Sequence, residues 1–175
     1  MKRKYKIAVY AIAKNEEKFI NRWYNSMREA DTIYVLDTGS TDKTYELLKE
    51  KGVQVIKKEI TPWRFDKARN ESLNLVPEDY DICVCSDLDE IFTPGWRDIL
   101  ESAWEPTTKQ LSYLYNWNHD EQGKPLISFR YEKIHTRQDF KWIYPVHEVL
   151  EYTGTNYHKT YCNNLILDHY QDTSK

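Results

Sequence analysis

The sequence predicts an α/β protein in which helices cover both faces of a mainly parallel sheet and a β-rich C-terminal half follows. Over the first hundred residues, strand-like apolar runs alternate with segments of helical periodicity, as in proteins built from βαβ units. After residues 105–109 (EPTTK) the helical periodicity weakens. Short runs rich in Tyr and Trp then alternate with polar turns such as DEQGKP, and this pattern favours strands.

The first two strand–helix units are predicted from residue 7 onward. The uninterrupted apolar run of Ile7–Ala13 suits a strand that is buried on both faces. Apolar residues at helical spacing predict a helix that includes residues 19–27 and has Asn15 as its cap. A second strand, TIYVLD, leads through TGSTD into a helix over residues 44–51, which Gly52 is placed to end.

Two further units complete the predicted parallel sheet. Residues 53–59 (VQVIKKE) are expected to form the third strand, residues 65–75 the next helix, and residues 81–87 (DICVCSD) the fourth strand. The last helix is expected to have Thr93 as its cap and Pro94 at its first position, because the apolar residues that follow recur at helical spacing.

The length of 175 residues indicates one domain, residues 1–175. A net charge of −3 and a pI near 6.0 argue against a nucleic-acid partner, because nucleic-acid-binding surfaces carry clustered excess Lys and Arg. We expect no transmembrane segment, since no apolar run approaches the ~18 residues of a membrane span; peripheral contact with a membrane stays open. The start, MKRKYK followed by IAVYAIA, is interpreted as a strand and not a signal peptide, because the apolar run is too short.

The cysteines and several histidines are expected to have ordinary structural places. The three cysteines show neither metal-ligand spacing nor a disulfide framework, which favours a reducing, cytoplasmic location. Cys83 and Cys85 share one face of a strand and are expected in the core. His119, His135 and His158 are expected on the surface.

Polar side chains mark the ends of three predicted strands. Asn15 follows the first strand, Asp37 ends the second, and Asp87 and Asp89 follow the fourth. Each of them alone could be a helix cap or turn former. Because ligands bind beyond the carboxyl ends of parallel strands, their joint placement predicts a binding site at this edge of the sheet.

The segment SDLDE carries the strongest chemical signal. Residues i and i+2 of an extended segment point the same way, so Asp87 and Asp89 are expected to face one site. Two carboxylates held so close disfavour each other's charge unless a cation lies between them. Carboxylate oxygens suit Mg²⁺ or Mn²⁺, which proteins bind through one or two carboxylates together with substrate phosphates.

Four segments together resemble the family-2 glycosyltransferases, which have the GT-A fold, a Rossmann-type sheet. They are AIAKNEE, VLDTGSTDKT, FDKARNESL and SDLDE, and their order and spacing match across residues 5–105. The resemblance implies a nucleotide-sugar-binding half over residues 5–105 and an acceptor-side half over residues 106–175. The chain also has no other phosphate-binding motif of the P-loop or G-x-G-x-x-G type.

The resemblance also implies roles for individual residues. Asp37 resembles the acid that hydrogen-bonds the base, and Ala13 and Glu16, with Asn15 beside them, line the nucleotide pocket. Arg69 resembles an arginine that helps to hold the nucleotide.

The acids of SDLDE have implied roles as well. Asp87 resembles the acid that touches the ribose or the metal, and Asp89 resembles the direct metal ligand. A metal that bridges both phosphates would neutralise the charge that develops on the leaving group.

The second half is expected to complete the site. DFKWIYPVHEVL is similar to a W…HE segment found in a bacterial subset of the family, which makes Glu148 a candidate general base for the acceptor. His147 or His169 is a candidate further ligand of the metal or diphosphate. Equally, the His–Glu pair could be an ordinary surface charge pair. Trp63, Trp117 and Trp142 could stack on sugar rings or simply fill the core, with Trp142 favoured for stacking.

The leading hypothesis is an inverting, metal-dependent glycosyltransferase that moves a sugar from a UDP-sugar to a glycan, lipid or peptide acceptor. One alternative is a sugar nucleotidyltransferase, although AIAKNEE is not the glycine-rich loop of that class. Another is a non-catalytic module that binds nucleotide or glycan. Relatives in the family usually run longer, which leaves open that residues 106–175 are a truncated acceptor-side half.

Overall fold

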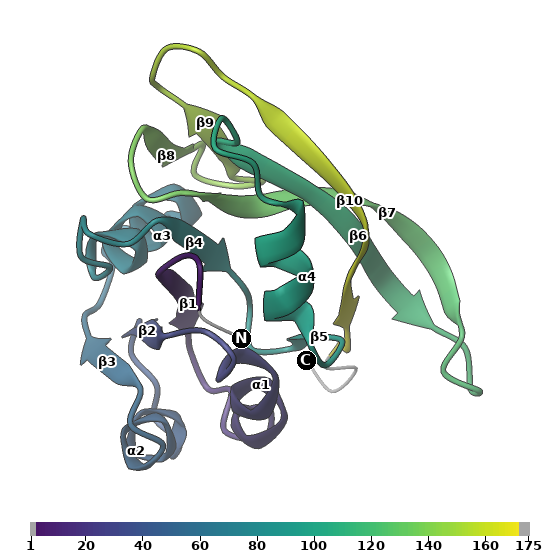
Figure 1. Cartoon of the computed structure of the whole chain (residues 1–175). Coiled ribbons are helices and arrows are strands. Elements are labelled where there is room, and N and C mark those ends of the chain that lie inside the picture. Colours follow the sequence, from purple (N-terminus) through teal and green to yellow (C-terminus); the bar gives the residue numbers. More distant parts are fainter. Residues whose placement is uncertain (1–2, 172–175) are drawn as a thin grey trace.

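The structure is a computed structural model that describes residues 3–171 (Figure 1). Its helices are α1 (Ile20–Met27), α2 (Thr44–Glu50), α3 (Phe65–Asn74) and α4 (Trp96–Ala103). Its strands are β1 (Ile7–Ala13), β2 (Thr32–Asp37), β3 (Gln54–Lys57), β4 (Ile82–Cys85), β5 (Glu90–Phe92), β6 (Gln110–His119), β7 (Pro125–Thr136), β8 (Phe140–Ile143), β9 (Val149–Tyr152) and β10 (Lys159–His169). Eight strands form one sheet in the order β3-β2-β1-β4-β7-β6-β10-β5, and β8 pairs with β9 in a second, small sheet.

The first half of the large sheet is parallel. β2 pairs with both β1 and β3, and β1 also pairs with β4, all in parallel register. The four strands therefore end at one edge, as the sequence predicts. The apolar runs of β1 and β4 are buried almost throughout, as expected for central strands that are covered on both faces.

Helices cover both faces of this parallel half, which confirms the predicted α/β class (Figure 1). On one face, alternate residues of β1, including Val9, pack with buried side chains of α1, α2 and α4 such as Trp23 and Trp96. On the other face, Tyr10 and its neighbours pack with Leu73 of α3 and with Trp142 of β8. The alternation follows from the two-residue period of a strand.

The second half of the chain extends the sheet with mixed strand directions. β7 pairs antiparallel with β4 and with β6, β10 runs parallel to β6, and the short β5 pairs antiparallel with the end of β10. β6 and β7 form a long hairpin that projects from the body of the molecule (Figure 1). Pairing of His169 with Glu90 places the end of β10 beside the SDLDE segment.

Two predicted helix starts are wrong. Asn15 does not cap α1, which begins at Ile20 with Phe19 in the cap position. Instead, Asn15 has a φ of 56°, and its Oδ1 accepts a hydrogen bond from the Thr41 backbone N–H at 2.8 Å. The fourth helix begins at Trp96, not Pro94, because the chain first forms β5 and then a left-handed turn at Gly95, where φ is 81°.

The core holds one histidine that was expected on the surface. His135 is fully buried, because its Nδ1–H can donate to the Thr136 carbonyl at 2.7 Å and its Nε2 can then accept from the Tyr10 hydroxyl at 2.9 Å. Satisfied hydrogen bonds are what make burial of a polar ring tolerable. Cys83 and Cys85 are buried and free, as predicted.

The two other histidines differ from each other. The His119 side chain is only 9% exposed and contacts Asp168, so the surface prediction is wrong for it too, whereas His158 is half-exposed. No helix within residues 3–171 is long and apolar enough to cross a membrane.

Candidate active site

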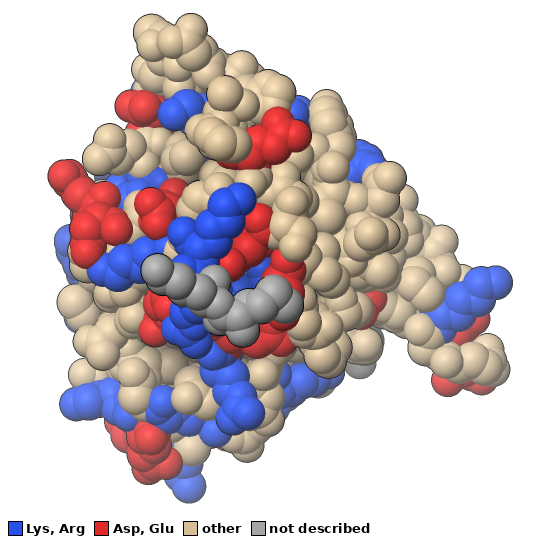
Figure 2. Space-filling model, viewed as in Figure 1, with Lys and Arg blue, Asp and Glu red and all other residues tan. Residues whose placement is uncertain are grey.

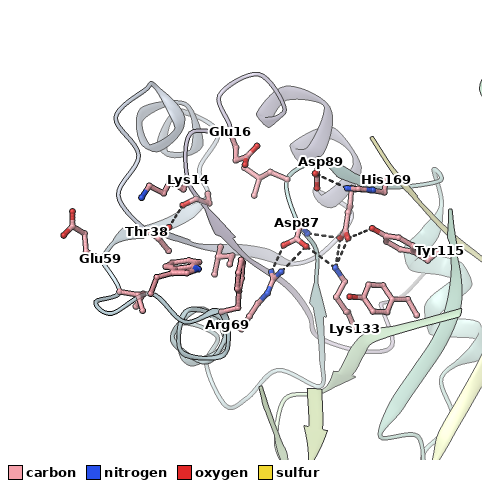
Figure 3. Close-up of a pocket in the computed structure, with 18 of the residues that line it drawn as sticks. Lys14, Glu16, Thr38, Glu59, Arg69, Asp87, Asp89, Tyr115, Lys133 and His169 are labelled. Carbon is pink, nitrogen blue, oxygen red and sulfur yellow. Dashed lines mark hydrogen bonds and ion pairs between the residues drawn. The ribbon is translucent and has the colours of Figure 1, made fainter. Parts of the chain in front are cut away.

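A pocket of about 780 Å³ lies where the ends of β1, β2 and β4 meet strands of the second half. Its other walls come from the loop between β3 and α3 and from β6, β7 and β10. The polar and aromatic side chains that line it include Lys14, Glu16, Thr38, Glu59, Trp63, Arg69, Asp87, Asp89, Glu90, Tyr115, Trp117, Tyr131, Lys133 and His169 (Figure 3). The pocket thus joins residues that lie as far apart in the chain as Ile12 and His169, because the sheet order places β4 next to β7.

Asp87 lies between two cations in the pocket wall (Figure 3). Its carboxylate accepts two hydrogen bonds from the Arg69 guanidinium, from Nη1 at 2.5 Å and from Nη2 at 3.0 Å. Lys133 Nζ lies 3.3 Å from its other side. A two-bond guanidinium–carboxylate pair fixes orientation as well as charge, so Asp87 is held rigidly.

Lys133 is a pocket residue that the sequence analysis missed. Its side chain is 4% exposed, and Nζ donates to Glu90 Oε1 at 2.7 Å and to Oε2 at 3.0 Å. Tyr115 also donates to Glu90 Oε1 at 3.1 Å. Strict alternation along β7 does not indicate it, because the β6–β7 pairing shifts register between Leu111 and Tyr113, whose partners Ile134 and Tyr131 are three residues apart.

The protonation equilibria of this cluster follow from burial and opposite charges. Burial by itself raises the pKa of Asp87, but the charges of Arg69 and Lys133 outweigh it and hold that pKa well below its usual range. Burial by itself lowers the pKa of Lys133, whereas Asp87 and Glu90 raise it well above its usual range. Burial raises the pKa of Glu90, and Lys133 opposes that shift.

Asp89 lies beside His169 and does not join the cluster around Asp87 (Figure 3). His169 Nε2 lies 3.1 Å from Asp89 Oδ2, and His169 Nδ1 lies 3.0 Å from the Trp117 carbonyl oxygen. A carbonyl only accepts, so Nδ1 carries a hydrogen and, in the neutral ring, Nε2 carries the lone pair. Burial by itself lowers the pKa of His169, but the hydrogen bond and charge of Asp89 raise it above its usual value.

The Asp89–His169 pair fits a divalent metal as two ligands and not as a full set. Among residues 3–171, no three His, Cys, Asp or Glu side chains are grouped to hold a metal ion. A His whose Nδ1–H is fixed by a backbone carbonyl presents Nε2 as a metal ligand. Mg²⁺ commonly binds one or two carboxylates and takes its other ligands from phosphates and water. The pair therefore suits a metal that arrives with a diphosphate.

The ends of β1 and β2 form the opposite side of the pocket. Ala13 and Glu16 line it, and the Ala13 carbonyl accepts hydrogen bonds from the backbone N–H and the hydroxyl of Thr38 at 2.8 and 3.1 Å. Asp37 lies directly behind Thr38 and is fully buried. Asn15 is not a lining residue; it holds the neighbouring loop through Thr41.

Only one of the two carboxylate oxygens of Asp37 has hydrogen-bond partners among the described residues. Its Oδ1 accepts from the backbone N–H groups of Gly39 at 2.9 Å and Ser40 at 2.7 Å. Within the described chain its Oδ2 is buried and has no hydrogen-bond partner. An unpaired buried oxygen costs free energy, and Asp37 itself is not among the residues that line the pocket.

Glu148 and His147 lie outside the pocket lining. Glu148 Oε1 accepts a hydrogen bond from Arg69 Nε at 3.0 Å, so one guanidinium links it to Asp87 in the pocket wall. His147 is exposed and has a φ of 55°. The structure brings Asp87, Asp89, Arg69 and His169 together around the pocket but does not bring His147 to them.

Of the three tryptophans, only the preference for Trp142 as the stacking residue is wrong. Trp142, which was favoured for sugar stacking, is 4% exposed. Its ring lies 5.6 Å from the Arg69 guanidinium carbon, and its Nε1 donates to the Tyr10 hydroxyl at 2.9 Å. Trp63 and Trp117 line the pocket instead, 45% and 40% exposed.

Two solved structures that are similar to this chain contain Mn²⁺ together with UDP-glucose or UDP. Glucosyl-3-phosphoglycerate synthase from Mycobacterium tuberculosis, in complex with Mn²⁺ and UDP-glucose, is 25% identical with a TM-score of 0.53, over 64% of this chain and 44% of that one. Its complex with Mn²⁺, UDP and glucosyl-3-phosphoglycerate gives a TM-score of 0.64 at 17% identity, over 98% of this chain and 74% of that one. These likenesses confirm the predicted GT-A fold.

Sequence comparison identifies the family. The chain is 23% identical over 148 residues to a TPR repeat-containing protein of Synechococcus elongatus; the match covers 83% of this chain but only 35% of that protein's length. The chain also matches glycosyl transferase family 2 over residues 8–154. This match spans β1 to β9 and most of the pocket described above, and the chain therefore belongs to glycosyl transferase family 2.

Proposed function

We propose that this domain transfers a sugar from a UDP-sugar to an acceptor hydroxyl with the help of Mn²⁺ or Mg²⁺. The observation that carries the proposal is the pair of Asp89 and His169 in the pocket, with the His169 lone pair directed at the carboxylate by the Trp117 carbonyl. Two acceptor atoms 3.1 Å apart repel unless a proton or a cation lies between them.

Asp89 and His169 would hold the metal. A metal bound there would supply positive charge to the diphosphate as it leaves the sugar. Asp87 is committed to Arg69, so we assign it to the ribose side of the pocket and not to the metal. Neighbouring structures that contain Mn²⁺ with UDP-glucose and Mg²⁺ with UDP support a UDP-sugar donor.

The residues at the ends of β1 and β2 would hold the nucleotide. Asp37 would accept a base N–H through Oδ2, which is buried without a partner among the described residues. Ala13 and Glu16 would border the nucleoside, and Asn15 would act through the loop it holds. Arg69 would act by keeping Asp87 in place.

Glu148 remains our candidate for the general base of an inverting transfer. Its link to Arg69 places it one guanidinium away from Asp87. A base must come within hydrogen-bond reach of the acceptor hydroxyl, so the segment between β8 and β9 would have to bring Glu148 closer when substrates bind. Glu148→Gln should then lower kcat strongly and leave the affinity for UDP unchanged. An unaltered kcat would exclude Glu148 as the base.

Thermal unfolding with UDP, with and without Mn²⁺, tests the metal-dependent donor site. A ligand that binds only the folded state raises Tm according to its affinity. We expect UDP to raise Tm only when Mn²⁺ is present, and Asp89→Asn and His169→Gln to abolish that increase. His119→Gln is a matched control, because His119 also lies against a carboxylate, Asp168 at 2.9 Å, but outside the pocket lining. An equal UDP effect in EDTA or in Asp89→Asn would refute the proposal.

A further inference from the structure

An exposed group of aromatic rings begins at the edge of the pocket and continues onto the β6–β7 hairpin. We call Trp117, Phe129 and Tyr131 the aromatic strip; they are 40%, 41% and 37% exposed. Tyr115 lies buried beneath them, with its ring 5.1 Å from that of Phe129 and 5.0 Å from that of Tyr131. Exposed aromatic side chains that lie side by side indicate a binding surface, whereas exposed apolar residues that are scattered singly do not.

The strip is continuous with the metal pair of the pocket. Trp117 and Tyr131 line the pocket themselves, and the Trp117 ring lies 4.7 Å from the His169 ring. Phe129 extends the same face outward, because it lies opposite Tyr115 in the β6–β7 register. A molecule that lay on the strip would therefore have one end beside Asp89 and His169.

The charges around the strip disfavour an anionic ligand. The pocket-lining cations within residues 3–171 are Lys14, Arg69 and Lys133. Arg69 and Lys133 already neutralise buried acids, and Lys14 lies across the pocket at the end of β1 (Figure 3). Arg130, between two residues of the strip, points to the opposite face, where it lies over the Tyr161 ring.

The distribution of charged side chains on the surface also argues against an anionic ligand. Figure 2 shows that, in its view, charged side chains gather over the first half of the chain. The surface over β6, β7 and β10 is largely uncharged up to the tip of the hairpin. A ligand on the part of the hairpin seen in Figure 2 would thus meet few charges.

We propose that the aromatic strip binds the acceptor of the reaction and that this acceptor is a neutral saccharide. The inference rests on the proposed glycosyl transfer, and it names the acceptor class. A pyranose ring presents a flat face of C–H groups that packs against an aromatic ring, while its hydroxyls stay hydrogen-bonded around the rim. A hydroxyl of the ring nearest His169 would then lie at the end of the pocket where the donor sugar is released.

Direct binding tests the proposal separately from catalysis. The probes are cellobiose, lactose and maltose as neutral saccharides and 3-phosphoglycerate as an anion, each added to the protein with and without UDP and Mn²⁺. Saturation-transfer NMR and tryptophan fluorescence report binding. We expect at least one disaccharide to bind, and 3-phosphoglycerate not to compete with it.

Variants identify the surface that binds. Phe129→Ala and Trp117→Leu should each weaken disaccharide binding about tenfold, and the Mn²⁺-dependent UDP effect on Tm should persist in Phe129→Ala. Tyr161→Ala is the matched control, because Tyr161 is 61% exposed but lies on the opposite face of the same sheet, and it should bind the disaccharide like the unmodified protein. If one of these two variants does not fold, disaccharide binding by the other variant tests the proposal.

The outcomes separate the two proposals. Absence of binding by all three disaccharides, preferential binding of 3-phosphoglycerate, or unchanged affinity in Phe129→Ala would overturn the aromatic strip as a saccharide site. Any of these results with an intact UDP–Mn²⁺ effect would leave the proposed function standing. Loss of the UDP–Mn²⁺ effect in the unmodified protein would instead overturn the proposed function, while the disaccharide measurement would still decide the strip.

Discussion

Lys133 Nζ lies 2.7 Å from Oε1 and 3.0 Å from Oε2 of Glu90, and both side chains are almost completely buried. Asp87 adds a second carboxylate at 3.3 Å from the same nitrogen. Two buried acids so close would disfavour each other's charge. The lysine therefore makes the acidic wall of the pocket compatible with folding before any ligand binds.

Lys133→Met should lower the free energy of unfolding by about 3–5 kcal/mol, because breaking a buried ion pair leaves an uncompensated charge. The double variant Lys133→Met/Glu90→Gln should recover part of that loss. Urea unfolding measures both. Lys159→Met is the comparison, since Lys159 pairs with Glu132 nearer the surface and should cost less than about 1 kcal/mol. Equal losses in the two single variants would contradict this account of the wall.

Arg69→Lys should weaken donor turnover although it keeps the charge. An ammonium group cannot donate to Asp87 through two nitrogens and to Glu148 through a third, as Arg69 does. We expect kcat/KM to fall about 10- to 100-fold, the equivalent of one or two charged hydrogen bonds. Arg97→Lys disturbs a similarly buried network around Asp31 and Glu101, away from the pocket. It should cost stability but leave the Kd for UDP and Mn²⁺ unchanged.

The affinity for UDP and Mg²⁺ should increase with pH through the raised pKa of His169. The ordinary value is 6.5, and Asp89 raises the pKa in the folded protein above it. A metal must replace the proton on Nε2, so binding strengthens as that proton is lost. Calorimetry from about pH 6 to 8.5 should show an inflection above 6.5, and His169→Gln should remove it.

Without metal, the contribution of His169 to the free energy of unfolding should decrease with pH, whereas the affinity for UDP and Mg²⁺ increases with pH. Because the folded-state pKa of His169 is the higher one, the protonated His169–Asp89 pair stabilises the fold fully below pH 6.5 and loses that contribution as the pH rises through the folded-state pKa. A metal-free unfolding series that showed the reverse trend in the difference from His169→Gln would contradict the assignment.

His135 should make the protein less stable in mild acid. Burial lowers the pKa of His135 to about 3. Near pH 6.5 the imidazole therefore binds a proton in the unfolded chain but not in the folded protein. The contribution of this group is complete above pH 6.5 and falls by at most about 1.4 kcal/mol per pH unit below it. Between about pH 6.5 and 5, His135→Gln should flatten the dependence in urea unfolding. An identical slope in both proteins would show that His135 is not the source.

Local patterns predicted most of the first half of the fold. The strands Ile7–Ala13 and Thr32–Asp37 have the predicted bounds, because their apolar runs and the turns after them are continuous in sequence. The start of α1 was mispredicted because Asn15 bonds to a loop 26 residues away. Such long-range partners of a polar side chain leave no local pattern.

Prediction of the site depended on contacts between distant residues. Strand ends and the family resemblance pointed to Asp87, Asp89, Arg69 and His169, all of which line the pocket. Lys133 was not predicted as a site residue, because a lysine in a strand ordinarily faces solvent. Only the pairing of β7 with β4 places it beside Asp87. The roles of Asp37 and Glu148 remain predictions.

The pairing of β5 with β10 has a consequence for how the protein folds during its synthesis on the ribosome. His169 is translated 80 residues after Asp89, and it reaches Asp89 only when the end of β10 docks on the three-residue β5. In a nascent chain that ended before β10, Asp89 would be present without His169 beside it. Competence to hold a metal would thus arise only after β10 has been translated and has joined the sheet.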